Sequence, residues 1–340
     1  MFRISIFFIS FFSVIGVAFA DTGDFDMKRW TSIMDDVRAR AVNQNISEST
    51  INDTLRSPAF IPAIVKSDKN QSEFKLTLAE YLNKTVNTTR IARGRQMRAK
   101  YPTLLSRVDK IYGLPQHVIL AFWGMESNYG EVKARHRLVD AFFTLMYDGR
   151  REKFFGDQLL ALMKIADTNS LDINNMRGSW AGAMGHFQFI PTTLASYGMD
   201  GNGDGRIDII DSVGDAMYSA GNYLNKLGWV KQEPIVLRVV LPQCFDKSLV
   251  DGKTKKTLDE WAEIGVLNTA LQKPTGDTVV GLVADASEID DCDYTSNADA
   301  EASRWVMTAY FTYPNFYRIK KWNNSNWYAI AIAELADKLK

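Results

Sequence analysis

The spacing of apolar side chains changes once along the chain, near residue 230. Before that point they recur at helix-like intervals, first in the segments 74–86 and 90–100. The pattern then predicts five more helices: one ending at Glu126, one over 138–146, one over 152–167, one beginning near Pro191 and one over 212–227. The sequence therefore predicts an N-terminal helical region over residues 21–112 and a helical core over residues 113–230.

After Trp229 the pattern becomes alternating and β-branched. Residues 234–244, 278–284 and 303–313 are of this kind, and turns rich in Pro, Gly and Asp separate them. These runs predict a small β-rich subdomain over residues 231–313. The last segment, 314–340, ends in a predicted helix from about Trp327 to Leu339. The expected fold class is mainly α, of the α+β kind.

The first twenty residues have the features of a signal peptide. Arg3 precedes an apolar stretch from Ile4 to Val17, and Ala18-Phe19-Ala20 is a small-x-small cleavage site. The alternative is an uncleaved anchor, but the stretch is too short for a comfortable membrane span. Cleavage would leave Asp21 first, with no cysteine at the junction to carry a lipid. We expect an exported protein without a membrane span after cleavage.

Charge and cysteine content exclude some classes of function. The 340 residues contain 40 Lys and Arg against 40 Asp and Glu, so the global basic field typical of nucleic-acid binding is missing. Cys244 and Cys292 are the only cysteines. Export favours a disulfide between them, with two buried thiols as the alternative. Together with the three histidines they show no zinc-site spacing.

Glu126 closes an otherwise apolar run from Val118 to Met125. Burial disfavours a charged carboxylate, so this side chain is biased toward its protonated form. Pro115 marks a helix entry, and Glu126 would then lie in the last helical turn, where the helix dipole raises its pKa further. A carboxylic acid with a raised pKa is the proton donor that glycosidic bond cleavage requires. The alternative is a structural glutamate paired with an arginine or a backbone group.

Residues 200–211 match the spacing of an EF-hand calcium loop. Gly205 stands at loop position six, where the turn is sharp, and Asp211 replaces the usual final glutamate. The sequence predicts a structural Ca²⁺ site, with Na⁺ or Mg²⁺ as alternative ions and an Asp/Gly turn cluster as the non-metal alternative. The predicted ligands are the side chains of Asp200, Asn202, Asp204, Asp208 and Asp211 and the backbone carbonyl of Arg206.

Two further segments combine aromatic and neutral polar residues. In residues 178–192, Gly182 and Gly185 would let backbone approach a substrate closely, and Ser179 and Gln188 are neutral hydrogen-bonding groups suited to an N-acetyl group. Trp180, Phe187 and Phe189 would supply faces for sugar stacking. The alternative is a tight helix-packing loop. Residues 315–329 carry Trp322, Asn323 and Tyr328, which belong either to the core or to a polar cleft.

These segments resemble the membrane-bound lytic transglycosylase B family of peptidoglycan-cleaving enzymes. Their order and spacing agree over nearly the whole mature chain. The matching stretches are Tyr112-Gly-Leu-Pro through Glu126-Ser-Asn-Tyr-Gly130, Gly149-Arg-Arg151, Ser179-Trp-Ala-Gly-Ala-Met-Gly-His-Phe-Gln-Phe-Ile-Pro191, the loop from Asp200, and Asn323-Asn-Ser-Asn-Trp-Tyr-Ala329. The resemblance implies a lysozyme-like helical catalytic domain with an N-terminal helical extension and a small β-rich subdomain.

The resemblance also implies the reaction and its residues. The β-1,4 bond between N-acetylmuramic acid and N-acetylglucosamine would be cleaved without net hydrolysis, leaving a 1,6-anhydro end. Glu126 is the single acid/base in this scheme, and Ser179 holds the N-acetyl carbonyl. The other implied cleft residues are Arg150, Arg151, Gln188, Asn323, Tyr328 and Tyr81. Trp322 and Phe154 stand where the family often has tyrosine, which puts contacts with individual sugars in question.

The implied partners are peptidoglycan glycan strands and, beyond them, the cell-wall synthesis machinery. Without a lipid-bearing cysteine, a soluble, periplasmic and monomeric member is expected. Two other functions compete: a muramidase that uses water and a second acid, and a non-catalytic peptidoglycan-binding protein. A calcium-dependent signalling module is disfavoured because only one loop of the EF-hand kind is present.

Overall fold

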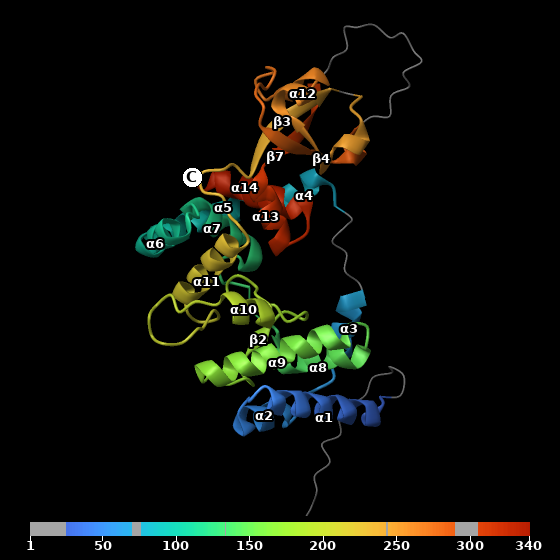
Figure 1. Ribbon diagram of the computed structural model, residues 1–340, viewed down its shortest axis with the longest axis vertical. Helices are drawn as coiled ribbons and strands as arrows, with labels where there is room; N and C mark the ends of the chain where they lie inside the picture. Colours follow the sequence, from blue (N-terminus) through green and yellow to red (C-terminus); the bar gives the residue numbers. More distant parts are fainter. Residues whose placement is uncertain (1–24, 70–75, 133, 243, 290–304) are drawn as a thin grey trace, which may run out of the picture.

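The protein is elongated, with helices at one end and a β-sheet at the other (Figure 1). The computed structural model describes residues 25–69, 76–132, 134–242, 244–289 and 305–340. Among them, no helix combines the length and the apolar character needed to cross a bilayer. Cys292 lies outside the described residues, and its disulfide with Cys244 stays a prediction.

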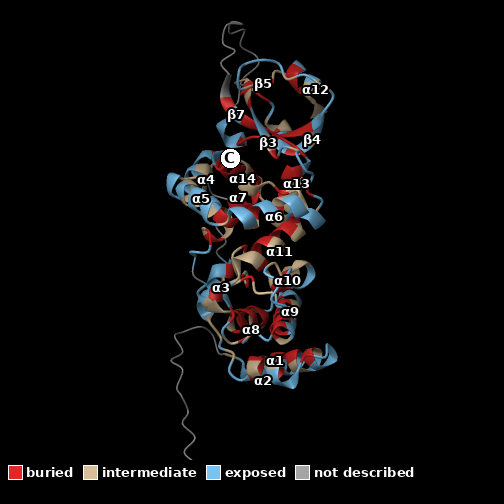
Figure 2. Cartoon of the chain, turned by 90° about the vertical axis from the view of Figure 1, so that its left-hand side faces the viewer, coloured by how far each residue is buried: buried red, intermediate tan, exposed pale blue. Residues whose placement is uncertain are grey.

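The half of the molecule far from the sheet is built around the helix pair α8 (Leu138–Asp148) and α9 (Glu152–Asn169). Buried side chains run along both helices (Figure 2). The elements packed around this pair are α1 (Met27–Asn43), α2 (Glu48–Leu55), α3 (Pro62–Lys69), α10 (Pro191–Tyr197) and the two-stranded ribbon of β1 (His136–Arg137) and β2 (Arg177–Gly178).

Helix α7 (Gln116–Ser127) is the centre of the other helical group. Its apolar run predicts burial on all sides, and neighbouring helices do cover it, because a helix apolar all round must be enclosed. Those neighbours are α5 (Thr88–Lys100), α6 (Pro102–Tyr112), α11 (Val213–Lys226) and α14 (Asn326–Lys338), with α4 (Leu78–Thr85) and α13 (Pro314–Trp322) packed on α14.

The sheet is antiparallel, has the order β4-β6-β7-β3-β5 and has a hydrophobic core of its own around Trp261. Strand β3 pairs with β7 along its length, from Val236 opposite Thr312 to Pro242 opposite Trp305. The elements of this part are β3 (Val236–Pro242), η1 (Lys247–Leu249), β4 (Asp251–Thr257), α12 (Leu258–Glu263), β5 (Leu267–Asn268), β6 (Val279–Val283), η2 (Ala286–Glu288) and β7 (Trp305–Thr312).

The expected mainly α, α+β fold class is confirmed. The predicted helix ends agree with the structure to within about two residues for α7, α8, α9 and α11, and Ser212 caps α11 by accepting from the Asp215 amide at 3.2 Å. Strand β4, of sequence Asp-Gly-Lys-Thr-Lys-Lys-Thr, was not predicted. Its residues have no apolar alternation because it lies at the edge of the sheet and pairs only with β6.

Candidate active site

Glu126 lies in the last turn of α7, as predicted. The helix ends at Asn128, which adopts a left-handed conformation with φ of 50° and allows the chain to turn away directly after the carboxylate. Helix α7 is buried along most of its length, and the Glu126 side chain is half-buried at its end. The carboxylate is therefore held at the edge of an apolar core.

Two donors from the C-terminal segment meet this carboxylate. The Trp322 indole donates to Glu126 Oε1 at 3.0 Å, and the Tyr328 hydroxyl donates to the same oxygen. Burial raises the pKa of Glu126 to about 7, and these two hydrogen bonds, which favour the charged form, lower it from a still higher value. No arginine or lysine pairs with Glu126 in the described part of the chain, which argues against the structural ion pair. A carboxyl group with this pKa exchanges its proton near neutral pH.

Trp322 connects the carboxylate to the rest of the site. Its ring packs against Phe122 of α7 at 5.0 Å between centroids and against Tyr223 of α11 at the same separation. The resemblance implied that a tyrosine often stands at this position, so its hydroxyl is missing here. In this chain the indole N–H at the same position donates to Glu126.

The loop between β2 and α10 approaches Glu126 through its aromatic residues. Phe187 and Phe189 pack against Trp322, with centroid separations of 6.5 and 5.2 Å, and Gln188 lies between them in a left-handed conformation. Ser127 Oγ, next to Glu126, donates to the His186 carbonyl at 2.7 Å. Gln188 is therefore held close to the end of α7, although its amide donates to Gly185 within the loop at 3.0 Å.

One prediction about this loop was wrong. Phe187 and Phe189 are buried at 1% and 3% exposure, so they belong to the core and are not available for sugar stacking. Gly182 and Gly185 are needed for close packing inside the protein: an added Cβ would collide with the Phe142 ring at Gly182 and with the Ile209 carbonyl at Gly185. Both have positive φ, which adds backbone strain to any substitution.

The remaining predicted cleft residues fall into two groups. Tyr328 touches Glu126 directly, Tyr81 of α4 interacts electrostatically with Tyr328, and Asn323 follows Trp322 at the end of α13. Ser179 is half-buried, and its hydroxyl accepts from the Ala183 amide at 3.0 Å, which closes the start of the loop. Tyr328, Tyr81 and Asn323 thus lie on the side of the C-terminal segment and α4, and contact of all four residues with substrate stays a prediction.

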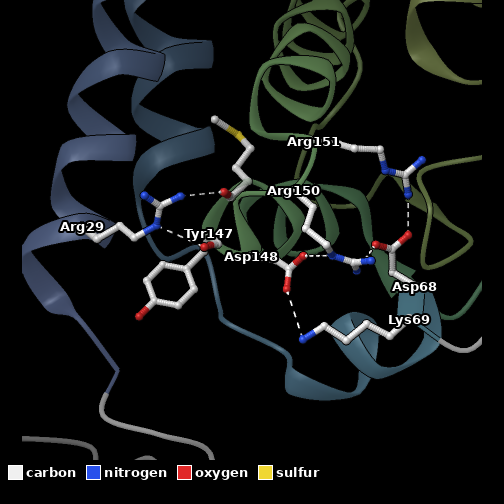
Figure 3. A network of polar contacts seen from close by, with 8 residues as sticks. Arg29, Asp68, Lys69, Tyr147, Asp148, Arg150 and Arg151 are labelled. Atoms are coloured by element: carbon white, nitrogen blue, oxygen red, sulfur yellow. Dashed lines mark hydrogen bonds and ion pairs between the residues drawn. The ribbon is translucent and has the colours of Figure 1, made fainter.

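Arg150 and Arg151 belong to a separate network at the turn between α8 and α9 (Figure 3). Both pair with Asp68 of α3, whose side chain is only 3% exposed, and Arg150 also donates to Asp148 at 2.6 Å. Sequence reasoning missed Asp68, because it lies 82 residues away and in no recognised motif. The guanidinium groups remain nearly half exposed and are held in fixed positions.

Arg151 also lies over aromatic rings. Its guanidinium carbon is 4.8 Å from the Phe155 ring centroid and 5.9 Å from that of Phe154. Phe154 is 41% exposed. A phenylalanine at this position thus supports the arginine by a cation–π contact, which needs no hydroxyl.

The predicted calcium loop folds as a compact turn with its acidic side chains facing its own amides. Asp200 accepts from the Gly203 amide at 2.6 Å and from the Gly205 amide at 2.8 Å, and Asp204 accepts from the Arg206 amide at 2.9 Å. In the described residues, no three acidic, histidine or cysteine side chains converge closely enough to hold a metal ion. The oxygen donors fit a hard cation by chemistry, because a carboxylate that accepts from an amide keeps further lone pairs.

The buried carboxylate that holds this loop is Asp215 of α11, which sequence reasoning missed. It is completely buried and accepts from the amides of Gly201, Asn202 and Asp208, at 3.0, 3.1 and 2.8 Å. Asp211, the predicted final ligand, is exposed. The available signal was an acid three residues after the N-cap Ser212, a position that favours negative charge.

Replacing Tyr328 by phenylalanine is expected to raise the pKa of Glu126 above about 7. The hydroxyl stabilises the charged carboxylate, and its loss removes a hydrogen bond that lowers the pKa. A charge-assisted hydrogen bond of ordinary strength corresponds to about one pKa unit. Carbon-13 NMR titration of labelled glutamate, with Glu126→Gln to assign the signal, measures the shift. Tyr218→Phe is the control, and a pKa that falls in Tyr328→Phe would contradict the assignment.

Comparison with known proteins gives consistent matches. A family model described as a transglycosylase SLT domain matches residues 29–337. Membrane-bound lytic murein transglycosylase B of Escherichia coli is 31% identical over 261 residues, covering 75% of this chain and 65% of that protein's length.

Two solved structures show the same fold. SltB3 of Pseudomonas aeruginosa, in complex with NAG-NAM-pentapeptide, is 33% identical with a TM-score of 0.79, covering 91% of this chain and 79% of that one. E. coli lytic transglycosylase Slt35, in complex with calcium, is 25% identical with a TM-score of 0.75 and 92% coverage of both chains. With a family model that spans nearly all of the described chain, this protein belongs to the transglycosylase SLT domain family.

Proposed function

We propose that the protein is a lytic transglycosylase that cleaves the bond between N-acetylmuramic acid and N-acetylglucosamine in peptidoglycan and leaves 1,6-anhydro ends. One observation carries this proposal. A single half-buried carboxyl group, with a pKa of about 7, is positioned by the Trp322 and Tyr328 side chains. Family membership and the ligand of the SltB3 structure support the choice of substrate.

In the proposed reaction Glu126 acts first as acid and then as base. The protonated carboxyl gives its proton to the leaving glycosidic oxygen, while the carbonyl of the neighbouring 2-acetamido group attacks the anomeric carbon. The resulting carboxylate then accepts the proton of the C6 hydroxyl, whose oxygen closes on the anomeric carbon and releases the acetamido group. Substrate assistance of this kind replaces the second carboxylate of ordinary glycosidases. A pKa near 7 suits both steps, because the group must release and regain a proton at the same pH.

We also propose roles for the predicted cleft residues. Gln188 and Ser179 lie on the loop that packs on Trp322, and would bind the N-acetyl group of the reacting sugar. Asn323, Tyr328 and Tyr81 would bind sugar hydroxyls on the side of the C-terminal segment. Arg150 and Arg151, which Asp68 fixes in place, would bind anionic parts of the strand.

The products distinguish the proposal from its rivals. Mature protein incubated with purified sacculi should release fragments that mass spectrometry identifies as 1,6-anhydro-muropeptides. Reducing ends would instead identify a hydrolytic muramidase. Binding to sacculi without any released fragment would identify a non-catalytic binding protein.

We propose further that the mature chain is exported to the periplasm as a soluble monomer after removal of residues 1–20. The expected partners are glycan strands and the cell-wall synthesis machinery. Cell fractionation followed by N-terminal sequencing should find Asp21 first in the periplasmic fraction. Recovery of the intact N-terminus in the membrane fraction would reject cleavage.

Calcium is the proposed structural ion of the loop from Asp200. Asp200, Asn202, Asp204, Asp208 and Asp211 would supply side-chain oxygens and Arg206 a backbone carbonyl. Saturation at 100 times the dissociation constant should stabilise the fold by about 2.7 kcal/mol. Thermal unfolding in Ca²⁺, Mg²⁺, Na⁺ and chelator measures this. Asp200→Asn should remove the response, and no response to any ion would reject the site.

A further inference from the structure

Three lysines gather where the sheet meets the C-terminal helices. Lys253 and Lys255 are two residues apart on the edge strand β4, where the pairing with β6 is irregular, and both side chains are exposed. Lys320 lies on α13, three residues after Tyr317 and on the same helix face. We call Lys253, Lys255 and Lys320 the lysine cluster.

Tyr317 holds the two elements of the cluster together. Its hydroxyl donates to the Gly252 carbonyl of β4 at 2.7 Å, and the Lys255 ammonium lies 3.5 Å from the centre of its ring. The ring therefore fixes the Lys255 side chain at the junction of β4 and α13, where an isolated surface lysine would move freely. Lys255 therefore has a defined position within the cluster.

Positive charge in the cluster exceeds the negative charge beside it. Asp251 lies 3.5 Å from Lys253, and in the described chain no carboxylate forms an ion pair with Lys255 or Lys320. Burial and then the charge of Lys320 lower the pKa of Lys255 to about 8. Burial and then the charge of Lys253 lower the pKa of Lys320, against an opposing effect of Asp251. A bound anion would relieve this mutual repulsion.

The cluster lies on the same C-terminal segment as the two donors to Glu126. The Lys320 ammonium donates to the Asn326 side chain at 2.7 Å. Trp322, two residues after Lys320, and Tyr328, two residues after Asn326, are the two side chains that donate to Glu126. An extended chain covers about 3.3–3.6 Å per residue, so a five-residue peptide spans roughly 17 Å. A peptide of this length, attached to a sugar at Glu126, would extend along the C-terminal segment toward the lysine cluster.

We propose that the lysine cluster binds the carboxylates of the peptide stem carried by the glycan strand. This inference rests on the proposed function, because peptidoglycan supplies the stem. A pentapeptide ends in a free carboxylate, and several ammonium donors around one or two carboxylates form charge-assisted hydrogen bonds. The β-rich subdomain thereby gains a role in substrate recognition, which makes the enzyme favour strands that still bear stems.

The test compares glycan strands with and without their stems. The double variant Lys255→Gln/Lys320→Gln is measured beside the wild type and beside Lys28→Gln/Lys164→Gln, which removes the same charge from exposed positions on α1 and α9. We expect the wild type to have about fivefold higher kcat/KM for stem-bearing strands at low salt. The ratio should fall to about one in the cluster variant, with unchanged activity on stem-free strands, and should persist in the control.

Several results would overturn the inference. One is a ratio in the cluster variant equal to that of the wild type, and another is an equal loss in both double variants, which would indicate net charge alone. A fall in turnover on stem-free strands would indicate a structural role. If no variant releases anhydro products, the proposed function fails. In that case calorimetry can still test the inference without turnover. It measures the affinity of Glu126→Gln for stem-bearing and stem-free strands, with and without the cluster substitutions.

Discussion

Replacing Glu126 by glutamine is expected to lower the release of anhydro-muropeptides by at least about a thousandfold. General acid–base catalysis by one group contributes about 10²–10⁴-fold, and Glu126 serves in both proton transfers. The fold should persist, because the amide oxygen of glutamine can still accept from Trp322 and Tyr328. Product release from sacculi, measured by liquid chromatography, gives the rate, and thermal unfolding should change by no more than about 2 °C.

Glu263→Gln is the matched control for this substitution. Glu263 is exposed at the end of α12, in the part of the chain with its own core, and the same chemical change there should leave the rate unchanged. Activity of Glu126→Gln close to that of the wild type would contradict the proposed mechanism. Loss of activity together with early unfolding would show instead that the carboxylate is structural.

The largest expected effect on stability is that of Asp215→Ala. The substitution leaves three backbone amides without the acceptor that a fully buried carboxylate provides. Each unsatisfied donor costs about 1–3 kcal/mol when water cannot replace the acceptor, so a loss of about 3 kcal/mol or more is expected. This corresponds to a Tm lower by roughly 4–5 °C or more in a chain of this length. Calorimetry in chelator measures it without any contribution from a bound ion.

Asp211→Ala tests whether the effect belongs to Asp215. Asp211 is exposed, so its loss should change stability by less than about 0.5 kcal/mol in chelator. Equal losses at both positions would mean that any acid of the loop supports it. A larger loss of stability at Asp211 than at Asp215 would show that Asp211, the final position of the calcium-loop spacing, is the more important acid.

Local patterns predicted the parts of the protein that depend on neighbours in the chain. Helix α7 and the position of Glu126 within it follow from one apolar run and a proline, and the capping of α11 follows from Ser212. Strand β4 could not be predicted this way, because pairing with β6 and not side-chain periodicity makes it a strand.

The surroundings of the acid depend on distant contacts. Trp322 and Tyr328 meet Glu126 across 196 and 202 residues, and nothing in the pattern near residue 126 indicates either donor. Phe187 and Phe189 were misread for the same reason: their composition suits a sugar surface, while tertiary packing against Trp322 buries them. Composition gives the chemistry that side chains can perform, and only packing decides which of them face solvent.

The two donors to Glu126 meet a single oxygen, and this has a consequence for proton delivery. An indole N–H can only donate, so Oε1 must remain an acceptor for as long as Trp322 stays in place. The acidic hydrogen of the neutral group is then restricted to Oε2. The protein thus selects one of two chemically equivalent atoms, and a sugar must present its bridging oxygen to that atom alone.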